Sequence, residues 1–404
     1  MDRREFFRHA AVCSAIGVAP AFLASAVARP NVPIAGFGDD HILVVVQLGG
    51  GNDGLNTIVP YGEDTYYRLR PTLGLRGSAI LPVDEHIAFN ARLTGLRDLY
   101  DSGRVAIVQG VGYPNPDRSH FRSMEIWHTA SGADTFLGSG WFGRYFDNHC
   151  DGSARPHAGL AVSADRPQAF EGRAGFGIAT DQPARFGWTA GDGTDTSRVF
   201  EALNEPRSTT NGTLDFLRLT TQHAVACSGE VREAAERGRV ASPGQRRRGL
   251  DQLDMVAGLI RGGLQTRVYY VATTGYDTHA GQLAQHDRLL AEFSEALVRF
   301  QRQIEDDGNA GRVIVLVFSE FGRRVAENGS GGTDHGTAAP VFVVGNRVRG
   351  GLHGAHPDLE DLDQGDLKFG TDFRSVYATI LSGSLGVPPD SVLEENFPLL
   401  PLLG

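Results

Sequence analysis

Acidic, imidazole and hydroxyl side chains recur in this 404-residue chain just after runs of apolar residues, where a buried strand would end. Carboxylates and imidazoles are the ligands that proteins offer to Zn²⁺, Mn²⁺, Mg²⁺ and Ca²⁺, with carboxylates favouring the harder ions and histidines favouring zinc. The pattern therefore predicts a divalent metal site. Its predicted ligands are Asp53, Asp277, His279, Glu320, Asp334 and His335.

Ser119 and His120 are the predicted catalytic residues. They follow an apolar run and begin a helical segment, where a nucleophilic hydroxyl profits from the positive end of the helix. A serine at this place is also the ordinary N-cap of a helix, and that interpretation stays open. Arg323 and Arg324 are predicted to bind an anionic group through paired hydrogen bonds.

Each predicted ligand also has a purely structural interpretation. His279 suits a local hydrogen bond, Glu320 suits an ion pair with a neighbouring arginine, and Asp334 suits a glycine-rich turn. The repeated occurrence of such residues at strand ends is what favours a common site. Two metal ions about 4 Å apart in such a site would serve phosphoryl or sulfuryl transfer.

The elements that must position these residues alternate along the chain. Continuous apolar runs predict strands, and the 3.6-residue period predicts helices between them. This alternation indicates an α/β fold with a largely parallel central sheet and helices on both faces, in which the carboxyl ends of the strands share one edge. The predicted strands are 41–48, 105–110, 267–272, 313–318 and 340–345, and the predicted helices are 93–102, 121–129, 214–237, 249–264, 283–304 and 373–385.

The glycine-rich segment after the first strand matches the dinucleotide-binding pattern G-x-G-x-x-G at Gly49, Gly51 and Gly54. Thr57-Ile58-Val59-Pro60 follows in place of the helix that this fingerprint requires. We therefore expect no nucleotide cofactor, and a dinucleotide oxidoreductase ranks last among the functions considered. Residues 131–212 are glycine-rich and weakly patterned, which predicts loops with additional strands and gives them no assigned role.

The amino terminus is typical of an exported protein. Arg3-Arg4 precedes a mostly apolar run over 10–27, and Ala26-Val27-Ala28 is a small-residue cleavage site. We predict a twin-arginine signal peptide over 1–28 and a single domain over 29–404, with 404 − 28 = 376 residues after cleavage. The expected partner is then the twin-arginine translocation machinery, and the expected location is the periplasm or the exterior.

Charge and hydropathy exclude some classes of partner, and the cysteine content leaves one possible disulfide open. The formal net charge of −10 argues against nucleic acid as a ligand, and no later segment is long and apolar enough for a stable membrane span. Removal of Cys13 with the signal peptide leaves Cys150 and Cys227, and the sequence does not decide whether they pair.

Taken together, the motifs resemble an exported bacterial family, domain of unknown function 1501. The resemblance extends over essentially the whole chain after the signal peptide. It rests on Gly49-Gly-Gly-Asn-Asp-Gly-Leu-Asn56, Pro114-Asn-Pro-Asp-Arg-Ser-His-Phe121, Gly275-Tyr-Asp-Thr-His279, Ser319-Glu-Phe-Gly-Arg-Arg324 and Gly332-Thr-Asp-His-Gly-Thr337.

That family in turn resembles the alkaline phosphatase and sulfatase superfamily, which implies a sheet between helices and a site for one or two metals. The resemblance implies that Asp53 is the first metal carboxylate and Ser119 the nucleophile. It further implies that Asp277, His279 and His335 are metal ligands.

The chain departs from the superfamily pattern Ser-Asp-His-Gly at Ser319-Glu320-Phe321-Gly322. Phe321 stands in the place of a ligand histidine, and a phenyl ring cannot donate to a metal.

Two functions follow from the sequence. The first is metal-dependent hydrolysis of phosphate or sulfate esters, with an anionic substrate. The alternative is a non-catalytic periplasmic binding or assembly protein on a degenerate scaffold of the same kind.

Overall fold

The computed structural model describes residues 40–150, 155–173, 175–187, 212–240 and 250–404. The predicted signal peptide therefore lies outside the described residues, as does about a third of the weakly patterned segment 131–212. Within the described residues, no helix combines the length and the apolar character needed to cross a membrane.

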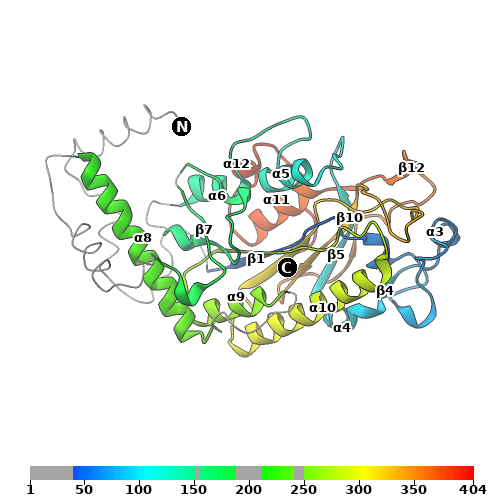
Figure 1. Ribbon diagram of the computed structural model, residues 1–404, viewed down its shortest axis with the longest axis horizontal. Coiled ribbons are helices and arrows are strands. Elements are labelled where there is room, and N and C mark those ends of the chain that lie inside the picture. The colour runs from blue at the N-terminus through cyan, green and yellow to red at the C-terminus, as the bar shows by residue number, and fades with distance from the viewer. Residues whose placement is uncertain (1–39, 151–154, 174, 188–211, 241–249) are drawn as a thin grey trace.

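A central sheet of nine strands forms the middle layer of the molecule, in the order β11-β5-β10-β9-β1-β8-β6-β7 with β14 beside β5 (Figure 1). Its main strands are continuous apolar runs because both faces of the sheet are covered. The strands of this sheet are β1 (Ile42–Leu48), β5 (Val105–Gly112), β6 (Gly159–Ala161), β7 (Ile178–Ala179), β8 (Val268–Thr273), β9 (Val313–Phe318), β10 (Ala339–Val344), β11 (Gly351–His353) and β14 (Thr371–Asp372).

The sheet is largely parallel, as the sequence predicts. Strand β1 pairs in parallel with β8 on one side and with β9 on the other, with Val46 opposite both Val271 and Val317. Strand β10 is the exception, because it runs antiparallel to both β9 and β5. The start of β10 therefore lies at the same edge as the carboxyl ends of β1, β5, β8 and β9.

Helices cover both faces of the sheet (Figure 1). On one face α4, α9 and α10 pack against Val44 and Val46 of β1, and on the other α5, α6, α11 and α12 pack against Leu43 and Val45. The helices are α3 (Asp64–Leu69), α4 (Thr94–Asp101), α5 (His120–Thr129), α6 (Trp141–His149), α8 (Gly212–Arg237), α9 (Gln252–Arg261), α10 (Gln282–Asp306), α11 (Phe373–Gly383) and α12 (Asp390–Leu393).

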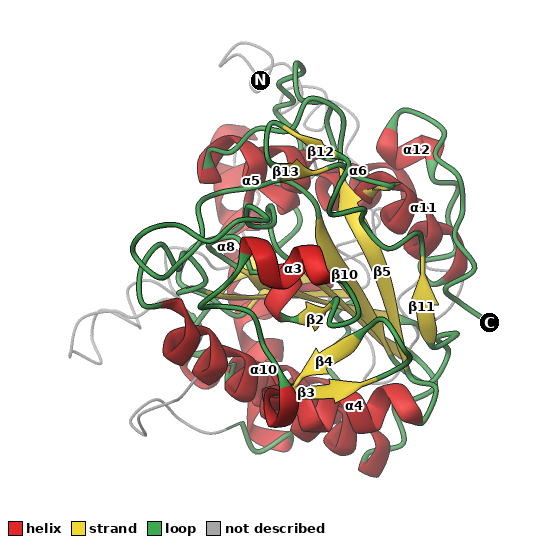
Figure 2. Ribbon diagram, turned by 90° about the vertical axis from the view of Figure 1, so that its right-hand side faces the viewer, coloured by secondary structure: helices red, strands yellow, loops and turns green. Residues whose placement is uncertain are grey.

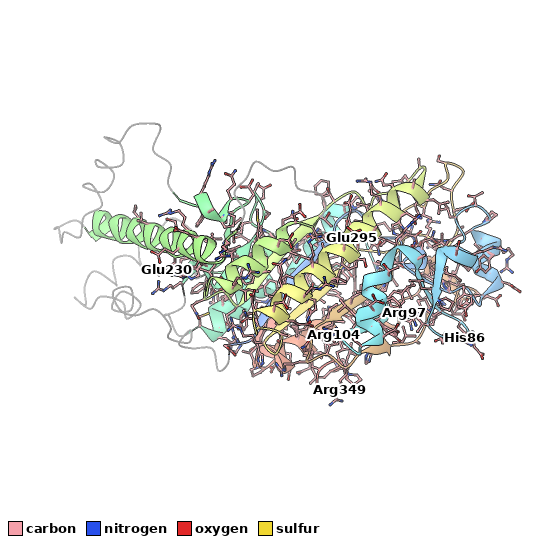
Figure 3. All side chains as sticks on the ribbon, turned by 90° about the horizontal axis from the view of Figure 1, so that it is seen from below. His86, Arg97, Arg104, Glu230, Glu295 and Arg349 are labelled. Atoms are coloured by element: carbon pink, nitrogen blue, oxygen red, sulfur yellow. The ribbon has the colours of Figure 1, made fainter. Side chains whose placement is uncertain are left out.

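The amphipathic pattern of α4 and α10 is visible from outside the molecule. Figure 3 looks onto these helices and labels Arg97 of α4 and Glu295 of α10, of which Glu295 is exposed. The inner side of α10 instead carries Leu290, Phe293 and Leu297, which are buried. This alternation of polar and apolar residues is the signal that predicts both helices from the sequence.

Smaller strands lie beside the central sheet near α3 (Figure 2). They form a three-stranded antiparallel sheet of order β2-β4-β3 and a separate hairpin. These strands are β2 (Ile58–Val59), β3 (Ile80–Pro82), β4 (Ala88–Asn90), β12 (Leu362–Asp363) and β13 (Asp366–Leu367).

Every predicted strand and helix is present to within a few residues of its predicted bounds. Within 131–212, β6 and β7 are the additional strands expected there, whereas α6 was not predicted. Helix α6 is only nine residues long, with Gly140 at its N-cap and Gly143 inside it, so it contains too few turns for a clear 3.6-residue period. The short 3-10 turn Gly54–Asn56 follows the glycine-rich segment, so no long helix completes a dinucleotide fingerprint.

We predict that Leu316→Ala lowers the free energy of unfolding by about 2–5 kcal/mol, because Leu316 is fully buried in the central strand β9 and its loss leaves a cavity. The matched control is Leu399→Ala, whose side chain is 57% exposed. It should change stability by less than about 0.5 kcal/mol. Urea unfolding followed by tryptophan fluorescence measures both, and equal midpoints for the two variants would contradict the placement of β9.

Candidate metal centre

Three predicted site residues converge at the sheet edge where β1, β8 and β9 end. His120, Asp277 and His335 each offer one ligand atom, and these atoms all lie within 4.8 Å of one another. His120 opens α5 after strand β5, Asp277 follows β8, and His335 precedes β10. The antiparallel direction of β10 is what brings His335 to this edge.

Asp277 is the centre of the cluster. Its carboxylate Oδ1 lies 3.1 Å from His335 Nε2 and 3.0 Å from His279 Nε2, and it accepts a 2.7 Å hydrogen bond from Arg323 Nη2. Burial raises the pKa of Asp277, but the hydrogen bond and the positive charge of Arg323 outweigh burial and bring the pKa to about 2. Asp277 is therefore an anion at neutral pH.

Both imidazoles are held through their Nδ1 atoms. His120 Nδ1 lies 2.8 Å from Glu320 Oε1, and His335 Nδ1 lies 2.8 Å from the backbone oxygen of Arg118. An acceptor at Nδ1 places the ring proton there and leaves the Nε2 lone pair for a ligand. In each ring Nε2 faces Asp277, at 3.6 Å for His120 and 3.1 Å for His335. Metal-binding histidines are oriented in this way.

Glu320 is a buried carboxylate that contacts the cluster through His120. Its side chain is 3% exposed, and Oε1 accepts a 2.8 Å hydrogen bond from the Gly50 amide as well as contacting His120. The hydrogen bond to Glu320 raises the pKa of His120. The sequence predicts Glu320 as a ligand, but the structure places it behind His120, where its carboxylate orients the imidazole.

His279 and Asp334 form the outer part of the cluster. His279 Nε2 lies 3.0 Å from His335 Nε2, and its Nδ1 lies 3.1 Å from Asp334 Oδ1. Hydrogen bonds from Asn328 and His279 lower the pKa of Asp334. Asp334 is thus the partner of His279, as Glu320 is the partner of His120, and it does not join the central group of three.

Arg323 is not positioned to bind an external anion. Its side chain is completely buried, and its nitrogen atoms donate to backbone oxygens of four residues as well as to Asp277. Because every part of the guanidinium is used in this way, the anion-binding role predicted for it is not supported. The four backbone acceptors are those of Gly50, Gly51, Tyr276 and Thr333.

Arg324 points to a different neighbour from Arg323. Its Nε lies 3.8 Å from the buried carboxylate of Asp366, which also pairs with Arg118. The two arginines that are adjacent in sequence therefore do not form a common clamp.

Asp53 lies outside the cluster, contrary to the sequence prediction. Its carboxylate is completely buried, with Oδ2 at 2.7 Å from Arg70 Nη1 and hydrogen-bonded to Gln282. Burial raises the pKa of Asp53, but the charge and hydrogen bond of Arg70 outweigh burial and lower it. Asp53 is thus a buried structural anion that is already paired with a cation.

Ser119 occupies the N-cap position of α5, as its second interpretation predicts. Its side chain is exposed. Among the described residues its hydroxyl makes no hydrogen bond, either to the helix it begins or to the cluster. Ser119 is nevertheless adjacent to His120, so it lies at the margin of the site.

Phe321 lies directly against the imidazoles. The centre of its ring is 4.8 Å from the ring centres of both His120 and His335. Gly51 makes room for this ring, because a Cβ atom there would lie 2.4 Å from it, and Gly51 also has a φ of +75° that favours glycine. An apolar ring thus fills the space beside the two imidazoles.

A cleft of about 460 Å³ opens beside the cluster and shares His120, Asp277 and Glu320 with it. Sequence reasoning missed the rest of its lining. Of these residues, Gln47 could be recognised in the sequence, because it is the polar residue inside the apolar run 42–48. The further lining residues are Gln47, Gly49, Gly50, Phe121, Met124, Glu125, His128, Gln168, Thr274 and Gly275.

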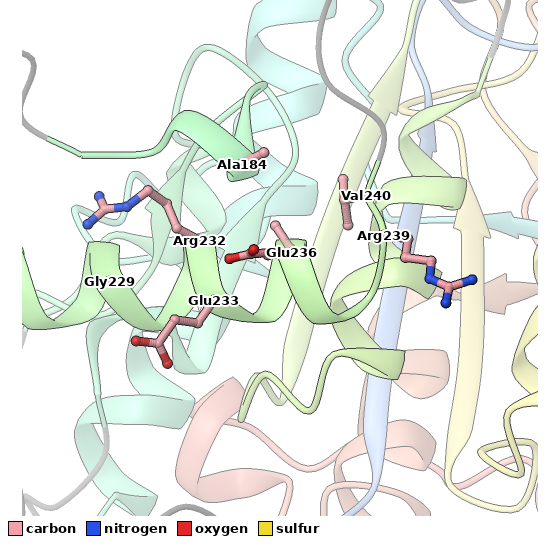
Figure 4. A pocket seen from close by; sticks show the side chains of 8 residues that line it. Ala184, Gly229, Arg232, Glu233, Glu236, Arg239 and Val240 are labelled. Carbon is pink, nitrogen blue, oxygen red and sulfur yellow. The ribbon is translucent and has the colours of Figure 1, made fainter.

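A second hollow, of about 610 Å³, lies beside the carboxyl-terminal part of α8 (Figure 4). Arg232, Glu233, Glu236 and Arg239 line it. It offers no imidazole, so it lacks the mixed donor set found at the sheet edge.

The comparisons with known proteins place the chain in a family. Residues 108–393 match the family model of a protein of unknown function, DUF1501. The chain belongs to this family, which confirms the resemblance seen in the sequence motifs. The comparison with curated proteins gave no match.

Among solved structures, the chain is similar to the lipoteichoic acid synthase LtaP from Listeria monocytogenes, at 9% identity and a TM-score of 0.39, covering 89% of this chain and 77% of that one. It is similar to a Vibrio parahaemolyticus protein of the alkaline phosphatase superfamily, at 11% identity and a TM-score of 0.38, covering 98% and 79%. A sulfatase from Pseudoalteromonas sp. matches at 9% identity and a TM-score of 0.35, covering 88% and 70%.

We predict that Asp53→Asn lowers the free energy of unfolding by about 3–5 kcal/mol, because it leaves the buried guanidinium of Arg70 without its counter-charge. If Asp53 is structural, the folded fraction of the variant keeps the metal content of the unchanged protein. Chemical denaturation and metal analysis of the folded protein test both parts. A stable Asp53→Asn variant that has lost its metal would instead restore Asp53 as a ligand.

Proposed function

We propose that this protein is an exported, metal-dependent hydrolase of phosphate or sulfate esters, and that His120, Asp277 and His335 hold its metal ion. The observation that carries the proposal is the cluster itself, in which two oriented imidazoles and one ionised carboxylate converge beside an open cleft. Three protein ligands with a free position are the arrangement of catalytic zinc sites.

The donor set fits a divalent ion. Two imidazoles and a carboxylate favour zinc over magnesium or calcium, and they are also acceptable to manganese. A bound ion of this kind would polarise the ester and lower the pKa of a bound water molecule. The outer pair of His279 and Asp334 lies within reach of the same region and contributes further donors.

The protein's own residues would prepare the reaction. Glu320 holds the proton of His120 on Nδ1, and the Arg118 carbonyl does the same for His335. Arg323 keeps Asp277 ionised and fixed. These contacts prearrange the ligands, so no reorganisation is needed when the substrate enters.

Ser119 is proposed as the nucleophile or as a residue that orients the attacking water. Its place at the start of α5 supports this role, because the positive helix end favours an approaching anion. Export by the twin-arginine route to the periplasm or the exterior is also part of the proposal, supported by the amino-terminal sequence.

We expect the purified protein to contain about one zinc or manganese ion per chain and to release phosphate or sulfate from a 4-nitrophenyl ester. Asp277→Asn removes the central anion and should abolish metal retention. Glu320→Gln leaves every direct ligand in place and should weaken metal binding by about 10–100-fold, because His120 loses its orienting carboxylate.

The control for both variants is Glu295→Gln on the exposed side of α10, which should bind metal normally (Figure 3). Metal content by mass spectrometry and affinity by competition with a chelator give the readouts. Equal metal content in Asp277→Asn and Glu295→Gln would refute the site. It would favour the alternative of a non-catalytic binding or assembly protein.

Ser119→Ala tests whether the hydroxyl takes part in the reaction. If Ser119 is the nucleophile, the variant should retain its metal and lose ester hydrolysis by several orders of magnitude. If it orients water, the loss should be about 10²–10⁴-fold, as for other positioned proton-transfer groups. Unchanged hydrolysis with unchanged metal content would leave Ser119 with no role beyond its place at the N-cap position of α5.

A further inference from the structure

The cleft beside the cluster continues along α5, away from the metal ligands. Phe121, Met124, Glu125 and His128 of α5 line one side of it. Gln47, at the end of β1, lines it together with Gln168 and Thr274. A substrate whose ester group sits on the cluster must place the rest of its structure here.

A chain of buried hydrogen bonds fixes the polar groups of this cleft. The Tyr270 hydroxyl donates to Gln47 Oε1 at 2.6 Å, and the same hydroxyl lies 2.9 Å from His128 Nε2. Tyrosine has one hydroxyl proton and gives it to Gln47, so His128 Nε2–H must be the donor to the tyrosine oxygen. Burial lowers the pKa of His128 to about 4, which leaves the imidazole neutral at pH 7.

These hydrogen bonds determine which donors and acceptors the cleft offers to a ligand. The carbonyl oxygen of Gln47 is occupied, so its amide Nε2 remains as a donor. Gly49 also lines the cleft, and a Cβ atom added to it would lie 3.4 Å from Gln47 Nε2. With its proton on Nε2, His128 retains a lone pair on Nδ1 as an acceptor. A donor and an acceptor that line the same cleft match hydroxyl groups, which both donate and accept.

The charges along the cleft exclude further anionic groups. The ionisable lining residues other than the histidines are Glu125, Asp277 and Glu320, and the described lining contains no lysine or arginine. Arg122 is 2.8 Å from Glu125 and the buried Arg323 is 2.7 Å from Asp277, so each of these arginines is already engaged by a lining carboxylate. An additional negative charge on the substrate would therefore be repelled.

Phe121 adds an apolar platform at the cleft. Its side chain is 91% exposed, although it is a large hydrophobic residue next to the candidate metal ligand His120. An exposed aromatic ring at a cleft that also carries hydrogen-bonding groups provides a flat face for the C–H groups of a ligand.

We infer that this cleft binds the alcohol part of the ester, and that this part is a neutral, hydroxyl-rich group such as a sugar or polyol. The inference rests on the proposed function and specifies its substrate class. Gln47 and His128 bind hydroxyl groups, Tyr270 is a positioning residue that orients both, and Phe121 packs against the apolar face of the ligand.

The test is the binding of methyl α-glucoside to the full mature protein, measured by saturation-transfer NMR and titration. Methyl α-glucuronide is the matched anionic probe. Tyr270→Phe removes the hydroxyl that holds Gln47 and His128, and Tyr269→Phe is the control, because the adjacent Tyr269 packs in the core on the opposite face of the sheet. Phe121→Ala removes the platform.

We expect the unchanged protein and Tyr269→Phe to bind the glucoside equally, and the glucuronide more weakly. Tyr270→Phe and Phe121→Ala should each weaken glucoside binding by about tenfold with unchanged metal content. Equal affinity in Tyr270→Phe and Tyr269→Phe, tighter binding of the glucuronide, or no glucoside binding at all would overturn the inference. Hydrolysis of 4-nitrophenyl esters without glucoside binding would refute the sugar site and leave the proposed hydrolase standing. Glucoside binding with this pattern in a protein that holds no metal would refute the hydrolase.

Discussion

The buried guanidinium of Arg323 is the interaction on which the site depends. A positive charge without water is costly unless every donor is paired, and here the partners come from three separate loops. Gly50 and Gly51 follow β1, Tyr276 and Asp277 follow β8, and Thr333 precedes β10. Because one guanidinium donates hydrogen bonds to all three loops, the loops cannot move independently. The cluster therefore exists as a preformed arrangement.

Chain direction provides the second constraint. In a fully parallel sheet, the loop that carries His335 would begin a strand at the opposite edge from the one where Asp277 lies. The antiparallel course of β10 places the beginning of that strand beside the ends of β8 and β9. A single reversal in an otherwise parallel sheet thus adds an imidazole to an edge that would otherwise collect residues from strand ends alone.

Much of the fold can be predicted from the sequence because it depends on local patterns. The apolar runs of β1 and β9 and the periodic apolar face of α10 can be recognised in the sequence, and all three are buried in the structure. Strand ends likewise predict the region of the site. They do not reveal which charge meets which partner. Asp53 and Asp277 have the same side chain and both follow a strand, yet only tertiary packing decides that the first meets Arg70 in the interior while the second faces a cleft.

Glu320 shows the same limit at longer range. Its partner His120 is 200 residues away in the sequence, and the contact with the Gly50 amide spans 270 residues. No local sequence pattern shows which residues make these long-range contacts. A carboxylate at a strand end is therefore predicted to be a metal ligand even where it orients one. Arg323 is similar, since two adjacent arginines suggest an exposed clamp and the burial of one of them depends on loops far from it in the chain.

The close fit of Phe321 against Gly51 also determines which side chains position 321 can hold. The ring fills the space between the glycine and the imidazoles of His120 and His335. A histidine is smaller than a phenylalanine, so the same space accepts an imidazole without any movement of the backbone. A single substitution at position 321 would therefore place a further imidazole beside the two that are present.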